Sequence, residues 1–222
     1  MYFRILENAQ HDAAGYLLAD LGHHRAVVID PPATSRSLIC ALLDERRLQL
    51  SDVLLTHLHA NDDGHEVLAL GQHTGAAIRL GKLVAHPPEA ATSLEEDDTL
   101  TVGDELIHAI ATPGHTAGCI SYRWRDRLFC GDVFDIGSCA AGNIEADAGA
   151  LFDSLTRRIL TLPDETLVFP AHGIRGQRVS TIGEQRRRLS QVTRHSREAF
   201  VTEMAFRRLA RPALEELLNP AN

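Results

Sequence analysis

The chain has 222 residues, of which 44% are hydrophobic and 23% charged, proportions typical of a globular protein and not of a disordered or fibrous one. Its 22 Lys and Arg against 30 Asp and Glu give a net charge of −8, which repels phosphate backbones and anionic lipid surfaces. We therefore expect neither nucleic acid nor a membrane as a partner. The apolar runs are too short to span a bilayer, and the N-terminus lacks the basic-then-apolar order of a signal peptide, so a cytoplasmic location is expected.

Short β-type runs separated by turn residues fill the first two thirds of the chain, and helical stretches interrupt them. Strands are expected at residues 15–19, 25–30, 52–56, 76–80, 106–111, 119–124, 128–130 and 166–169. Helices are expected at 35–47, 148–160 and, in a C-terminal extension over 180–222, at 184–197, 198–209 and 212–218. This alternation predicts a layered α/β fold in a single domain that spans residues 1–222.

Four of the expected strand-to-loop transitions carry side chains that can bind a metal ion. His57 and His59 follow one apolar strand at positions i and i+2, where extended geometry sends both side chains to the same side. His115 stands in a Pro-Gly-His turn, Asp132 in Cys-Gly-Asp and His172 in Pro-Ala-His. Each feature alone is compatible with a structural histidine or a simple turn. The four together, each directly after an apolar strand, predict a metal site.

Three of these segments resemble motifs of the metallo-β-lactamase superfamily: TPGHTAGC at 112–119, FCGD at 129–132 and LVFPAH at 167–172. The resemblance covers nearly the whole chain and implies an αββα sandwich, with the metal-binding loops along one edge of the paired sheets. Within the superfamily, the segments 179–186 and 196–201 resemble the C-terminal signature of the persulfide dioxygenases. That resemblance implies Fe²⁺ held by His57, His115 and Asp132, a homodimer, and a persulfide and O2 as substrates.

The sequence departs from the superfamily's first motif, H-x-H-x-D-H, because its last two positions are occupied by Asn61 and Asp62. In two-metal hydrolases that aspartate and histidine hold the second ion, so their replacement argues against a standard two-zinc hydrolase. Three residues of the same loop could replace them: Asp62, Asp63 or His65. With one ion, His59 and His172 are expected to orient the ligands or assist catalysis; with two ions, both become direct ligands.

Two further departures concern the substrate site. After the Gly-Asp motif the family carries an arginine-bearing stretch around a cysteine, and this chain keeps the cysteine as Cys139 but has no arginine there. After the last motif histidine the family has an Asp-Tyr pair, which is replaced here by Gly173 and Ile174. We expect Cys139 and Arg175 to contact the substrate. The lost polar groups predict a persulfide that is smaller or less anionic than glutathione persulfide.

The leading functional hypothesis is a non-haem Fe²⁺-dependent dioxygenase that converts a low-molecular-weight persulfide to sulfite and a thiol. Two histidines and one carboxylate suit such an iron site because they leave coordination positions open, although the same ligands also accept Zn²⁺. One alternative is a zinc-dependent thioester hydrolase like glyoxalase II, which needs an improvised second metal site. The other is a catalytically impaired metal-binding protein that senses or carries sulfur species.

Overall fold

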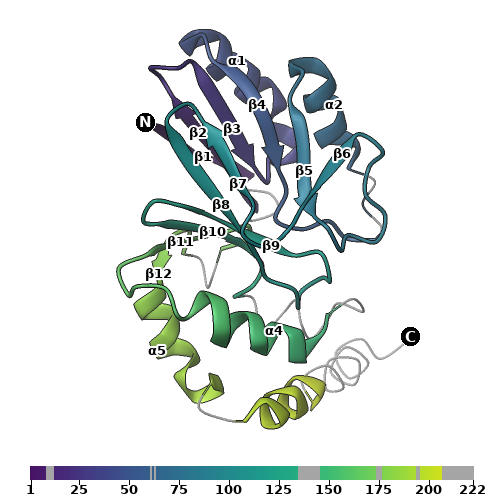
Figure 1. Cartoon of the computed structure of the whole chain (residues 1–222), viewed down its shortest axis with the longest axis vertical. Helices are drawn as coiled ribbons and strands as arrows, with labels where there is room; N and C mark the ends of the chain where they lie inside the picture. Colours follow the sequence, from purple (N-terminus) through teal and green to yellow (C-terminus); the bar gives the residue numbers. More distant parts are fainter. Residues whose placement is uncertain are drawn as a thin grey trace, which may run out of the picture.

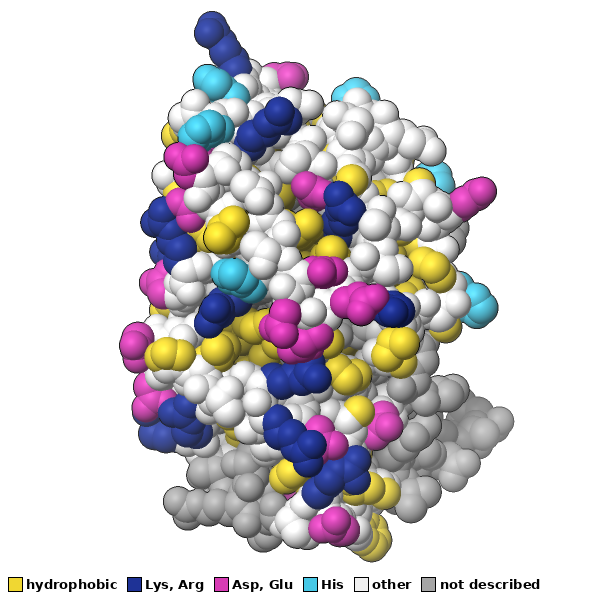
Figure 2. All heavy atoms as spheres, viewed as in Figure 1, with side chains coloured by type: hydrophobic (Ala, Val, Ile, Leu, Met, Phe, Trp, Pro, Cys, Tyr) yellow, Lys and Arg dark blue, Asp and Glu magenta, His cyan; other side chains and the backbone are white. Residues whose placement is uncertain are grey.

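The computed structural model describes residues 1–8, 13–60, 62, 64–134, 146–173, 177–193 and 196–206. Two six-stranded sheets face each other, and helices cover the outer face of each, so the fold has four layers (Figure 1). This is the αββα sandwich that the sequence predicts. Acidic and basic side chains are interspersed over the face seen in Figure 2.

The first sheet has the strand order β1-β2-β3-β4-β5-β6. β1, β2 and β3 pair antiparallel, and β3 to β6 pair parallel. Its strands are β1 (Tyr2–Asn8), β2 (Ala13–Asp20), β3 (Arg25–Ile29), β4 (Gln49–Leu54), β5 (Ala77–Gly81) and β6 (Ala91–Leu94). The outer face is covered by α1 (Arg36–Arg46), which follows a short 3-10 turn (Ala33–Ser35), and by α2 (His65–Thr74).

The second sheet has the order β12-β11-β10-β9-β8-β7, and all its pairings are antiparallel except that of β10 with β11. Its strands are β7 (Thr99–Val102), β8 (Glu105–Ala111), β9 (Ile120–Trp124), β10 (Arg127–Gly131), β11 (Leu167–Pro170) and β12 (Ser180–Thr181). Its outer face is covered by α4 (Ala148–Ser154), which continues as a π-helical turn (Leu155–Ile159), by α5 (Ile182–Thr193), and by a helical segment at 197–206.

The central strands β2 and β3 are buried on both faces, and their side chains alternate between two apolar layers. In β2, Leu17 packs in the cluster under α1 and α2, whereas Tyr16 and Leu18 pack between the sheets. Val28 and Val27 of β3 divide in the same way. A third cluster joins the second sheet to α4 and to the helical segment at 197–206. Both sheets are therefore held rigidly, and the loops at their shared edge start from fixed points.

The structure contains elements that the sequence analysis did not predict, namely β1, β6, β7, β12 and α2. The start of α2 carries no capping side chain, since Gly64 occupies that position, so the usual sequence signal of a helix start is missing. β6, β7 and β12 have at most four residues and form through pairing with longer neighbours. The helix expected at 184–197 ends at Thr193, and the one expected at 212–218 lies outside the described residues. In the described part of the chain, no helix is both long and apolar enough to span a membrane.

Candidate metal centre

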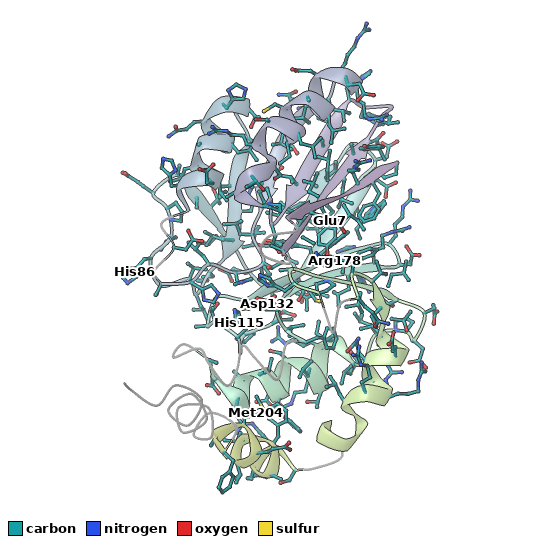
Figure 3. The ribbon with its side chains drawn as sticks, turned by 180° about the vertical axis from the view of Figure 1, so that it is seen from behind. Glu7, His86, His115, Asp132, Arg178 and Met204 are labelled. Carbon is teal, nitrogen blue, oxygen red and sulfur yellow. The ribbon has the colours of Figure 1, made fainter. Side chains whose placement is uncertain are left out.

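The turns that bear the candidate ligands meet where the edges of the two sheets approach each other. His57 and His59 follow β4 of the first sheet, whereas His115, Asp132 and His172 follow β8, β10 and β11 of the second. His115 and Asp132 lie near the middle of the molecule, between its two halves (Figure 3). The cluster therefore combines ligands that are far apart in the sequence and come from both sheets.

The donor atoms of this cluster are as close together as a single metal ion requires. The ring nitrogens that His57, His59 and His115 offer lie within 4.8 Å of one another, and Nε2 of His59 is 3.3 Å from Nε2 of His115. Asp132 Oδ2 lies 3.5 Å from His57 Nε2 and 3.8 Å from His115 Nε2. Ligands about 2.1 Å from one ion, at angles of about 90–110°, are roughly 3.0–3.4 Å apart. Small side-chain movements would therefore let this donor set enclose an ion.

Asp132 and His57 hold the protonation states that metal binding needs. Burial lowers the pKa of His57 to about 4, so this imidazole is neutral at pH 7. Burial of Asp132 opposes ionisation, but the hydrogen bond from His172 and, below about pH 4, the charge of the protonated His57 ring outweigh it and lower the carboxyl pKa to about 2. Nδ1 of His172 donates to both carboxylate oxygens, at 2.9 and 3.1 Å. The carboxylate is thus anionic and fixed in orientation.

Two glycines allow the backbone to deliver the ligands. Gly131 has φ +56°, and a Cβ there would lie 2.5 Å from Oγ1 of Thr56. Gly114 has φ +146°, and a Cβ there would lie 2.4 Å from the backbone of Leu151 in α4. Only glycine combines these torsion angles with this close approach. The turns before Asp132 and His115 therefore depend on both positions.

A partly buried chain of hydrogen bonds from Asp30 through Thr56 orients the His57 ring on its Nδ1 side. The Asp30 carboxylate accepts hydrogen bonds from the backbone N–H of Thr56 (2.8 Å) and from its hydroxyl (2.7 Å). Because the hydroxyl proton is directed to Asp30, Thr56 Oγ1 accepts from Nδ1 of His57, 3.0 Å away. That leaves the lone pair of Nε2 facing the cluster. Desolvation raises the pKa of Asp30 to about 7, so a cation bound nearby favours its ionised form.

Replacing Thr56 by valine should weaken metal binding about 10- to 100-fold, because valine matches threonine in shape but cannot hold the His57 tautomer. Titration with Fe²⁺ or Zn²⁺ against a competing chelator measures the change. Thr56→Ser is the matched control, since it keeps the hydroxyl and should bind within about threefold of the wild type. Equal affinity in the valine and serine variants would contradict this orienting role.

Comparison with known proteins agrees with the geometry. A family model described as the metallo-beta-lactamase superfamily matches residues 64–172. The mitochondrial persulfide dioxygenase ETHE1 of Homo sapiens is 31% identical over 210 residues, which cover 93% of this chain and 82% of the human protein. This chain belongs to the metallo-β-lactamase superfamily.

Among superfamily members of known structure, ETHE1 from Myxococcus xanthus is similar with a TM-score of 0.82 and 35% identity, covering 92% of this chain and 90% of that chain. The hydroxyacylglutathione hydrolase of Photobacterium profundum is 32% identical over 152 residues, which cover 68% of this chain and 58% of the hydrolase. The similarity to the ETHE1 proteins thus extends over more of both chains than the similarity to this hydrolase.

The structure brings together the five superfamily positions that the sequence analysis selected: His57, His59, His115, Asp132 and His172. Within the described residues, Asp62 and His65 do not join them. Oδ1 of Asp62 accepts a hydrogen bond from the Gly64 N–H (2.9 Å), and the His65 side chain is 77% exposed at the start of α2. Asp63, Cys139 and Arg175 lie outside the described residues.

The sequence analysis missed Asp30 and Thr56. Asp30 lies directly after β3, and the parallel pairing of β3 with β4 places it beside the end of β4, where its own N–H donates to Leu54 O (2.9 Å). Two features of the sequence could have indicated them. Asp30 is a carboxylate at the end of an apolar strand, and Thr56 is a hydroxyl residue directly before His57.

Proposed function

We propose that this protein is an Fe²⁺-dependent persulfide dioxygenase that catalyses RSSH + O2 + H2O → RSH + SO3²⁻ + 2 H⁺. The outer sulfur of the persulfide loses four electrons, and O2 accepts them. The observation that carries the proposal is the compact cluster of imidazoles and one carboxylate between the sheets, in a chain similar to ETHE1 proteins over nearly its full length.

In this proposal His57, His115 and Asp132 hold the ion, since their donor atoms converge and the two most deeply buried ligands are 2% and 5% exposed. Bound Fe²⁺ supplies open positions for the persulfide sulfur and for O2 and overcomes the spin barrier of O2. His59 lines the hollow beside the cluster, and its Nε2, 3.3 Å from Nε2 of His115, would accept the proton that a persulfide sulfur loses there. His172 keeps the Asp132 carboxylate in one orientation.

A thioester hydrolase with Zn²⁺ is the second candidate, favoured by the similarity to hydroxyacylglutathione hydrolases. It requires ligands for a second ion in the loop after His59. The Asp62 carboxylate accepts a hydrogen bond from the backbone of that same loop, and no described residue of the loop joins the imidazole cluster. A third candidate is a non-catalytic protein that binds a metal ion and senses or carries sulfur species. It is compatible with the replacement of the last two positions of the H-x-H-x-D-H motif by Asn61 and Asp62.

The proposal is tested with anaerobically purified protein loaded separately with Fe²⁺ and with Zn²⁺. We expect one iron per chain, and O2 uptake, sulfite and thiol in equal amounts when the iron form receives a persulfide such as phenylmethyl or glutathione persulfide. The zinc form is the matched control and should consume no O2. Hydrolysis of S-lactoylglutathione by the zinc form, without O2 uptake by the iron form, would replace the proposal by the hydrolase; bound metal with neither activity would favour the carrier.

The cytoplasmic location and the homodimer expected from the sequence stay predictions. The same holds for the choice of iron over zinc. Size-exclusion chromatography with light scattering settles the oligomer independently of the metal experiment.

A further inference from the structure

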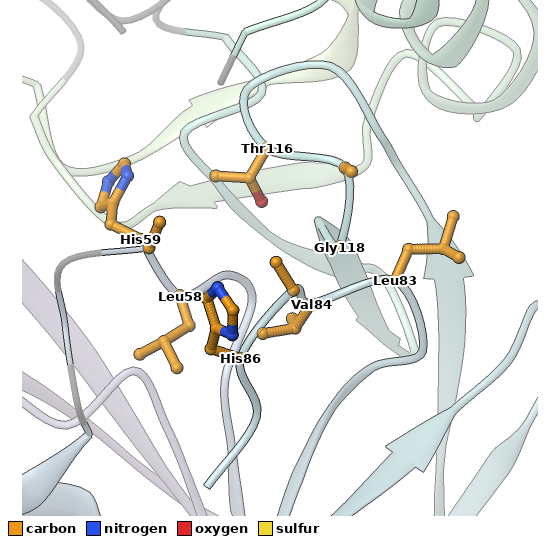
Figure 4. A pocket seen from close by; sticks show the side chains of 10 residues that line it. Leu58, His59, Leu83, Val84, His86, Thr116 and Gly118 are labelled. Carbon is orange, nitrogen blue, oxygen red and sulfur yellow. The ribbon is translucent and has the colours of Figure 1, made fainter. Parts of the chain in front are cut away.

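A hollow of about 260 Å³ opens beside the metal cluster on the side of His59 (Figure 4). Its walls come from three loops, those after β4, after β5 and after β8. The lining residues are Leu58, His59, Ala60, Leu83, Val84, Ala85, His86, Thr116, Ala117 and Gly118. His59 belongs both to the imidazole cluster and to this lining, so the hollow offers space for the organic part of a molecule whose sulfur reaches the cluster.

The described lining is mostly apolar. Among the described residues that line the hollow there is no Lys, Arg, Asp or Glu, and His59 and His86 are the titratable ones. Lys82, the cation next to it in sequence, forms an ion pair with Glu95 at 2.7 Å on the exposed surface. A carboxylate placed against this wall would lose hydration and gain no charged partner, which is unfavourable.

Leu83 is an exposed apolar residue in the lining of the hollow. Its side chain is 64% exposed, the highest value among the large hydrophobic side chains outside the C-terminal helical segment in the described part of the chain. It also borders a neighbouring hollow of about 320 Å³, which shares Ala117 and Gly118 and adds Leu94 and Ile120. That second hollow is also lined by Lys82, Glu95 and Glu96, so the uncharged lining belongs to the hollow beside His59. The exposed leucine extends the apolar surface of that hollow, which an organic group can cover.

We propose that this hollow selects persulfides with an uncharged apolar organic group, and that Leu83 is a specificity-determining residue. The inference rests on the proposed function and deepens it, because it names the substrate class of the same site. Glutathione persulfide carries two carboxylates and an ammonium group, and the described lining offers no Lys, Arg, Asp or Glu side chain to pair with them. An aryl or alkyl tail loses only its contact with water and is favoured at this wall.

The iron-loaded protein should oxidise phenylmethyl persulfide with a kcat/KM at least about tenfold above that for glutathione persulfide. Leu83→Ser should lower kcat/KM for phenylmethyl persulfide about fivefold and leave that for glutathione persulfide unchanged. Ala85→Arg, at an exposed position of the wall, should raise the value for glutathione persulfide about threefold. Leu38→Ser on α1 is the matched control, because Leu38 is 43% exposed and lies outside the hollow.

Binding of the product thiols provides a readout that does not depend on turnover. Calorimetry on the metal-loaded protein should show phenylmethanethiol binding more tightly than glutathione, with the difference reduced in Leu83→Ser. Equal use of both persulfides by the wild type, or equal effects of Leu83→Ser on both, would overturn the inference. If neither persulfide is oxidised but the thiols bind in this order, the proposed function is wrong while the preference of the hollow stands.

Discussion

Replacing Asp132 by asparagine is expected to lower metal affinity by about a thousandfold and to remove measurable persulfide oxidation. The side chain keeps its shape, but the cluster loses the one anionic donor that it has among the described residues, which lies 3.5 and 3.8 Å from two imidazole nitrogens. The hydrogen bonds from His172 then meet an amide instead of a carboxylate. Iron content after anaerobic dialysis and O2 uptake measure the two effects.

Asp62→Asn is the control for this experiment, since it makes the same chemical change in the neighbouring loop at an exposed side chain. It should retain the metal content of the wild type. Loss of metal in both variants would show that Asp62 is a ligand, and would contradict the single-ion site. Loss in neither would remove Asp132 from the metal centre altogether.

Gly131→Ala is expected to lower the free energy of unfolding by about 3 kcal/mol, whereas Gly75→Ala should cost about 1 kcal/mol. Both glycines have positive φ, +56° at Gly131 and +76° at Gly75, so alanine is strained at either position. The difference lies in the space available. A Cβ at Gly131 would meet Thr56 Oγ1 at 2.5 Å and Thr56 Cβ at 2.8 Å, but at Gly75 no atom lies within 4 Å.

Urea unfolding of the metal-free proteins separates strain from steric overlap, because bound metal would add its own stabilisation. Gly131→Ala should also bind metal more weakly, since Thr56 and Asp132 flank the added methyl group. Equal losses of stability in the two variants would mean that the turn before Asp132 adapts freely, and the close approach would then have no structural importance.

Much of the sheet architecture was predictable because strand signals are local. The run that ends at Leu54 and the turn Pro113-Gly114 are readable from neighbouring residues alone, and they place His57 and His115 at strand ends. α2 was missed because Gly64 supplies no capping side chain. The short strands at the sheet edges were missed because their conformation depends on a partner strand distant in sequence.

The proximity of the candidate ligands was predictable from the same strand ends, but the groups around them were not. Asp30 reaches Thr56 only because β3 and β4 pair in parallel with one particular register. The hollow beside His59 exists only where the loop carrying Leu83 and Val84 approaches the turn that contains Thr116. Both features result from packing between segments distant in sequence, which the periodicity of the sequence does not report.

Because the candidate ligands come from both sheets, an ion bound at this position would link the two halves of the sandwich. His57 belongs to one half and Asp132 to the other, so opening the two halves requires release of the ion. A ligand that binds only the folded chain adds about 2.7 kcal/mol of stability at a hundredfold excess over its dissociation constant. In a cell, the supply of the metal would then set the lifetime of the polypeptide against proteases.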